Sequence, residues 1–166
     1  MEIKKIIYLS MLLAITVILS IFESFIPLFN GIIPGLKIGL ANIIIVYSLY
    51  IYGFKDTLFL SLLKVLLVGI LRTGLFSIGF FISLSGSCFS IIMMYIVKKT
   101  KLSIIGVSII GAIFHSIGQV VMAIILLKSF NLIYYLPYLF IFSIFTGIII
   151  GSISKELIKK IPKYCN

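Results

Sequence analysis

The stretch IIGVSIIGAIFHSIGQVVMAIILL (residues 104–127) contains no Asp, Glu, Lys or Arg, whereas Lys101 precedes it and Lys128 follows it directly. A helix needs ~20 predominantly apolar residues to cross the ~30 Å hydrocarbon core of a bilayer. A long uncharged segment between two lysines is typical of a membrane span, because the charged side chains stay at the two interfaces. We therefore predict a transmembrane helix here.

Similar apolar segments fill the rest of the chain. Hydrophobic residues make up 62% of the sequence and charged residues only 11%, unlike a soluble domain. The apolar segments cover residues 6–29, 38–54, 58–71, 76–97, 104–127 and 134–154. The second and third are of marginal length for a span. We predict an all-α integral membrane protein, with residues 1–166 forming one bundle of six transmembrane helices.

The basic residues predict the orientation of this bundle. With a cytoplasmic N-terminus, six crossings leave only Lys37, Arg72 and Lys128 on the outer side. The cytoplasmic side collects most of the others: Lys4, Lys5, Lys55, Lys98, Lys99, Lys101, Lys155, Lys159, Lys160 and Lys163. Because cytoplasmic loops carry the excess of Lys and Arg, we expect both termini in the cytoplasm and the protein in a bacterial-type cell membrane. Lysines facing an anionic leaflet explain the net charge of +10 without nucleic-acid binding.

The acidic residues are too few for several kinds of chemistry. Asp56 is the one aspartate, and Glu2, Glu23 and Glu156 are the glutamates. A metal or Mg²⁺–diphosphate site needs several converging carboxylates. The sequence also lacks the GxxxxGK[ST] loop that binds nucleotide phosphates. We therefore expect no catalytic residues, metal or cofactor.

Polar residues inside the predicted spans indicate a binding pocket. Ionisable groups in hydrocarbon are costly and usually face a cavity or a partner. At ~1.5 Å per helical residue they fall mainly in the outer half of the bundle. His115 and Gln119 are four residues apart, so they share one face of a helix. Lys64 and Arg72 are eight residues apart, about two helical turns, and are expected to share a face in the same way. We expect helices 2 to 6 to form an outward-open pocket for a small anionic or acceptor-rich molecule, bound by Lys37, Asn42, Lys64, Arg72, His115 and Gln119.

Structural roles are alternatives for the same residues. Lys37 and Arg72 can extend toward lipid headgroups. His115 can form a hydrogen bond between helices with no ligand, and Lys64 can pair with Glu23, which would make the pocket less positive. Phe76, Phe80, Phe81, Phe114, Tyr134 and Tyr135 are candidates for its apolar walls.

Small residues four apart mark two further helix faces. Ser10 and Ala14 form such a pair in the first predicted helix, and Gly147 and Gly151 form a GxxxG pair in the sixth. These pairs let helix backbones approach closely, either within the bundle or against a partner subunit.

Four segments resemble a known family: IFESFIPL (21–28), PGLKIGLANI (34–43), LRTGLFS (71–77) with Lys64 before it, and GVSIIGAIFHSIGQ (106–119). The family is named heptaprenyl diphosphate synthase component I, or Gx transporter. It is similar to the substrate-binding (S) components of energy-coupling-factor transporters. The resemblance implies a six-helix protein that captures a micronutrient from outside and works with a membrane coupling subunit and two cytoplasmic ATPases. It also implies docking of the coupling subunit at Ser10 and Ala14, with Ser where Ala is usual.

The two family names imply different functions. Prenyl diphosphate synthases carry paired Asp-rich motifs, and this sequence has none. A non-catalytic membrane partner of such a synthase stays open as the alternative to the S component. A secondary carrier would be expected to show an internal repeat or discontinuous helices. No repeat is evident, but the irregular stretches 27–37 and 38–71 keep the carrier as a third alternative.

Overall fold

The computed structural model describes residues 2–25 and 39–161, and these residues are helical apart from short connections. No strand occurs in these two ranges. The elements in chain order are α1 (Glu2–Phe25), α2 (Leu40–Ile51), α3 (Phe54–Val68), the π-helical turn η1 (Gly69–Thr73), α4 (Ile78–Lys98), α5 (Ile104–Leu127), the 3-10 helix η2 (Phe130–Tyr135) and α6 (Leu136–Lys160). The prediction of an all-α protein is confirmed.

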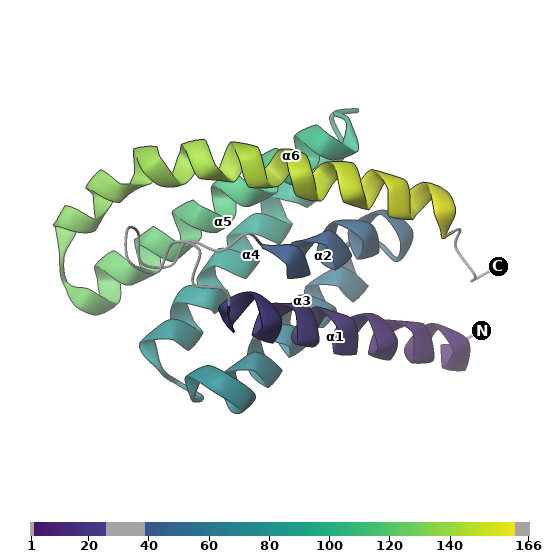
Figure 1. Cartoon of the computed structure of the whole chain (residues 1–166), viewed down its shortest axis with the longest axis horizontal. Coiled ribbons are helices and arrows are strands. Elements are labelled where there is room, and N and C mark those ends of the chain that lie inside the picture. Colours follow the sequence, from purple (N-terminus) through teal and green to yellow (C-terminus); the bar gives the residue numbers. More distant parts are fainter. Residues whose placement is uncertain (1, 26–38, 162–166) are drawn as a thin grey trace.

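Four of these segments are long and apolar enough to cross a membrane: Ile3–Phe25, Ile78–Lys98, Ile104–Leu127 and Phe130–Lys160. The remaining helices, α2 with 12 residues and α3 with 15, are shorter than a full span. Six crossings and their orientation stay predictions. The start of α1 and the end of α6 lie at the same end of the molecule (Figure 1), as an even number of crossings requires.

The observed helix boundaries differ from the predicted ones mainly at the start of α1, at the start of α3 and at the end of α6, which continues past Ser154 to Lys160. Helix α1 begins at Glu2 and includes Lys4 and Lys5, because lysine side chains can reach the interface from within a helix. Helix α3 begins at Phe54, with Asp56 in its first turn, where a carboxylate suits the positive end of the helix dipole. Helices α1 and α3 therefore begin before the charged residues that mark the starts of their apolar segments.

Glycines bring α4, α5 and α6 into close contact. A Cβ added at Gly111 of α5 would lie 2.5 Å from Met94 Cγ on α4. On α6, a Cβ at Gly147 would lie 2.6 Å from Ile109 Cα, and one at Gly151 would lie 2.7 Å from Ile105 Cα. Since these last two neighbours are backbone atoms of α5, the GxxxG pair forms an interface within the bundle.

Helix α1 packs more loosely, against α2 and α3. It lies on the other side of α2 from α6 (Figure 1). Large apolar side chains remain exposed on its outer face, including Ile7, Met11 and Ile18. The buried apolar core instead joins α2, α3, α4, α5 and α6, with Leu49 and Val107 fully inside it.

Candidate functional site

A cavity of about 100 Å³ lies between the helices, and all six α-helices and η1 contribute to its lining. Its polar lining includes Glu23, Asn42, Lys64, His115 and Gln119. Helix α1 lines it with Ser20 and Glu23 near its end, and α6 lines it with residues between Leu139 and Ile150. The cavity therefore lies in the half of the bundle away from the start of α1 and the end of α6 (Figure 1).

Glu23 joins α1 to the start of α2 at this cavity. Its side chain is only 7% exposed, and its Oε1 accepts a hydrogen bond from the backbone N–H of Gly39. Gly39 precedes α2 with a φ of 81°, a conformation that favours glycine. A carboxylate at this position is stabilised by the N-terminal end of the helix dipole. The side chain thus has a structural role at the edge of the cavity.

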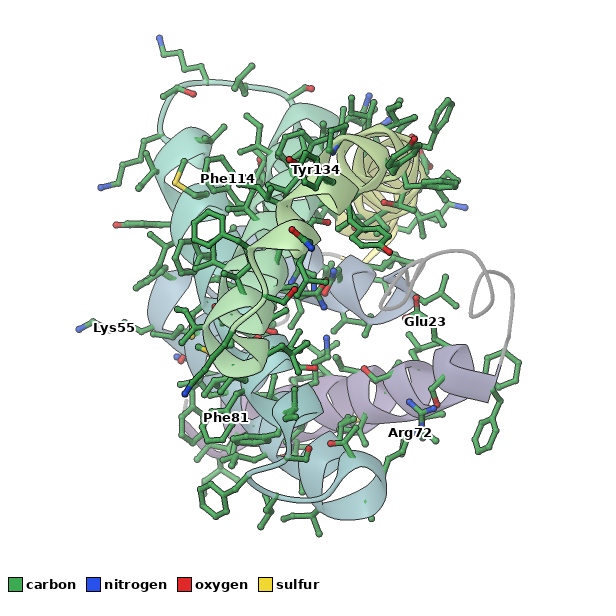
Figure 2. All side chains as sticks on the ribbon, turned by 90° about the vertical axis from the view of Figure 1, so that its left-hand side faces the viewer. Glu23, Lys55, Arg72, Phe81, Phe114 and Tyr134 are labelled. Carbon is green, nitrogen blue, oxygen red and sulfur yellow. The ribbon has the colours of Figure 1, made fainter. Side chains whose placement is uncertain are left out.

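Arg72 does not line the cavity with Lys64. Its Nη2 donates a hydrogen bond to the carbonyl oxygen of Ser24, 3.2 Å away, on the exposed surface. Figure 2 shows Arg72 beside the last turn of α1 and Glu23 between α1 and α2. Arg72 therefore lies apart from Lys64, although the spacing along the chain predicts a shared face. It belongs to the π-helical turn η1, which follows the end of α3.

On the opposite wall, α4 makes room for two polar residues of α5. A Cβ at Gly86 would lie 2.7 Å from Gln119 Cγ and 3.0 Å from the carbonyl oxygen of His115. Both residues line the cavity, in agreement with their predicted shared face. The glycine therefore allows these two turns of α5 to approach α4 closely.

Hydroxyl groups supply much of the remaining polar lining. Ser116 of α5 and Ser143 of α6 form a buried hydrogen bond of 2.8 Å between their Oγ atoms. Ser20 Oγ is buried and finds no hydrogen-bond partner among the described residues. Because buried polar atoms are normally paired, a hydroxyl of this kind at a cavity suits a bound polar molecule or water.

The structure brings together four of the six residues expected at the pocket: Asn42, Lys64, His115 and Gln119. Arg72 lies elsewhere, and Lys37 falls outside the described residues. Of the aromatic residues expected to form the apolar walls, only Phe80 lines the cavity. Phe142, which the sequence did not single out, also lines it. The other expected aromatic residues are not part of the lining: Phe76, Phe81, Phe114, Tyr134 and Tyr135. Whether any of these residues binds a ligand stays a prediction.

The sequence did not single out Ser20, Ser116 or Ser143 as cavity residues. Serine within an apolar helix also packs closely or bonds its own backbone, as Thr146 does by donating to the carbonyl oxygen of Ser143. Ser116 directly follows His115 in the sequence. Helical periodicity alone, however, places Ser116 on a different face of the helix from His115, so the sequence did not predict that both line the cavity.

Ser10 and Ala14 lie on the exposed face of α1. Ile7, Met11 and Ile18 surround them on the same face and are also exposed. Because their side chains are small, Ser10 and Ala14 leave a shallow depression in an apolar surface. This depression is open to lipid or to another membrane helix.

Residues 12–157 match the family model described as heptaprenyl diphosphate synthase component I. Searches of curated proteins and of solved structures gave no match.

Proposed function

The chain belongs to the heptaprenyl diphosphate synthase component I family, and from this premise we propose that it is the substrate-binding (S) component of an energy-coupling-factor type importer. In this role it captures a small anionic or acceptor-rich micronutrient from outside the cell membrane. Asn42, Lys64, His115 and Gln119, which line the cavity, bind this molecule.

The cavity carries this proposal. It places a carboxylate, an ammonium, an imidazole and two carboxamides within a bundle whose chain is 62% hydrophobic. Ionisable groups among apolar helices are costly, and they are typically found on the binding path of transport proteins. They gather here in one half of the bundle, the half predicted to face outward.

Energy for import has to come from other subunits. The sequence has no phosphate-binding loop, so nucleotide binding is assigned to two cytoplasmic ATPase subunits. A membrane coupling subunit would connect them to this protein. Its docking site is the exposed face of α1, where Ser10 and Ala14 allow close approach of a second helix.

The family description favours a second candidate, a non-catalytic membrane component of a polyprenyl diphosphate synthase. Such a protein would hold a soluble catalytic subunit at the membrane. Within the described residues, no three His, Cys, Asp or Glu side chains lie together to hold a metal ion. The prenyl transfer itself would therefore fall to the partner.

Purification from the native host in mild detergent separates the two candidates. We expect the coupling subunit and both ATPases to be recovered with the wild-type protein. Ser10→Leu should reduce their recovery, since a large side chain fills the shallow depression on α1. Ser152→Leu, the same change at an exposed position of α6, is the matched control. Recovery of a prenyl synthase subunit without any ATPase would support the second candidate and overturn the first.

The orientation is tested separately with single cysteines at Thr73 and Lys101, both exposed and at opposite ends of α4, in a chain whose Cys88 and Cys165 are replaced by Ser. An impermeant thiol reagent should label position 73, and not position 101, in intact cells. The reverse pattern would invert the topology and place the cavity on the cytoplasmic side.

A further inference from the structure

The charges that line the cavity cancel. Among the described lining residues, Glu23 is an acid and Lys64 is a strong base, with His115 as a weakly basic group. Arg72 lies outside and bonds to Ser24, and Lys128 follows the end of α5 without lining the cavity. The formal charge of the lining is therefore zero with His115 neutral. The sum is the same whether or not Glu23 and Lys64 are in contact.

Glu23 also occupies the position at which an anion would otherwise bind. The N-terminus of a helix attracts phosphate because of its free N–H groups and its dipole. At α2 the N–H of Gly39 already donates to Glu23, whose carboxylate is almost fully buried. A ligand phosphate near this helix would meet a negative charge in place of an open N–H group.

Phosphates and diphosphates are consequently poor ligands for this cavity. A diphosphate would bring several negative charges into a site that holds one ammonium and one carboxylate. Buried charge without compensation is strongly unfavourable. A neutral molecule avoids this cost, and it can bond to the carboxamides of Asn42 and Gln119 and to the hydroxyl of Ser20.

We propose that Glu23 is a specificity-determining residue that restricts the cavity to a net-neutral molecule with several hydrogen-bonding groups and excludes phosphates and diphosphates. The inference rests on the proposed function in taking the cavity as the substrate site. The proposed function allows an anionic or an acceptor-rich substrate. The present inference keeps the acceptor-rich molecules and excludes those with a net negative charge. A prenyl diphosphate is then excluded from this cavity under either candidate function.

Inorganic pyrophosphate is the probe, and its binding is measured by titration calorimetry on purified protein in lipid nanodiscs. Glu23→Gln removes the charge, while the Gln oxygen can still accept the hydrogen bond from Gly39. We expect no measurable binding to the wild type, and binding to Glu23→Gln at least about tenfold tighter, from the Coulomb energy of one nearby charge. The double variant Glu23→Gln/Lys64→Met should lose this gain. Arg72→Gln added to Glu23→Gln is the control and should keep it.

Two results would overturn the inference. One is pyrophosphate binding by the wild type that is lost in Lys64→Met, and the other is a Glu23→Gln protein that binds pyrophosphate no better than the wild type. Should Glu23→Gln fail to fold, Lys64→Met alone gives the mirror-image test. Its cavity is net negative, so guanidinium should bind at least about tenfold tighter than to the wild type, and an absence of gain would contradict the inference. All measurements use the isolated protein, so a failure to recover ATPases would refute the importer while leaving this result intact.

Discussion

The two sides of the cavity are built in different ways. The wall made by α4, α5 and α6 is closed by glycines that put helix backbones in direct contact, as at Gly147 against Ile109. Helix α1 lies against α2 and α3 with much of its surface exposed. It is held by polar contacts at its ends: Lys5 with Asp56, Glu23 with Gly39, and Ser24 with Arg72.

This contrast indicates which side of the cavity can move. Backbone-to-backbone packing leaves no slack, because close-packed interiors do not deform continuously. A helix with few buried contacts and exposed hydrogen bonds opens at lower cost. The cavity volume of about 100 Å³ is also below the ~300–1,000 Å³ typical of ligand pockets. A larger ligand would therefore be accommodated by movement of α1.

The largest expected effect lies on the glycine-packed side. In Gly147→Ala the new Cβ would lie 2.6 Å from Ile109 Cα, a backbone atom that cannot turn away. We expect the free energy of unfolding to fall by about 1–3 kcal/mol, as for other overpacked sites, with a lower melting temperature in detergent. Gly106→Ala on α5 is the matched control, since its nearest atom lies at 3.6 Å. Equal melting temperatures for Gly147→Ala and Gly106→Ala would contradict the claim that close backbone contacts hold the α4, α5 and α6 side of the cavity together.

Ligand affinity should depend on the charged side chains that line the cavity and not on the charged side chains outside its lining. Lys64→Ala should weaken binding about tenfold or more, the equivalent of one charge-assisted hydrogen bond. Arg72→Ala should have a smaller effect, because its guanidinium bonds to Ser24 outside the lining. Lys128→Ala is the control with no expected change. Equal losses for Lys64→Ala and Arg72→Ala would place the binding site at the rim.

The attachment of α1 is tested through Arg72. Arg72→Ala removes the hydrogen bond to the Ser24 carbonyl. Since this bond is exposed, we expect a local cost of about 0.5–1 kcal/mol. Hydrogen exchange should become faster in the last turn of α1, with no change at Val107 in the core of α5. Faster exchange across α5 as well would show that the two sides unfold together.

The smallest effect is expected at the other end of α1. Lys5 Nζ lies 2.8 Å from Asp56 Oδ2, with the side chains 40% and 25% exposed. A double-mutant cycle with Lys5→Gln and Asp56→Asn should give a coupling of about 0.2–1 kcal/mol. The value should decrease with added salt. The more exposed pair of Lys159 and Glu156, 3.7 Å apart, should give a still smaller coupling. A coupling unaffected by salt would contradict a surface ion pair.

The sequence predicted the helical class and the length of α5 because apolar content is a property of each segment by itself. Residues 104–127 match α5 to the residue. Helix ends are harder to predict when charged residues can belong to either side of the boundary. Lys4 and Lys5 lie within α1, and Lys55 and Asp56 lie within the first turn of α3.

The site was predictable where a face lies on a regular helix. His115 and Gln119 share a face of α5, and both line the cavity. The bond between Arg72 and Ser24 depends on how η1 packs against the end of α1, which the spacing of Lys64 and Arg72 along the chain does not contain. The bond between Ser116 and Ser143 depends on how α5 and α6 pack, which the periodicity of either helix alone does not contain.

The central claim is that the cavity holds the molecule that this protein captures. Mass spectrometry of small molecules extracted from purified protein tests it most directly, on the wild type, on Lys64→Met/Gln119→Leu and on the control Lys128→Met. The double variant replaces two polar cavity residues by apolar ones of similar size. We expect one small molecule to be retained by the wild type and the control and to be lost from the double variant. Equal retention in all three proteins, or no retained molecule in the wild type, would contradict the claim.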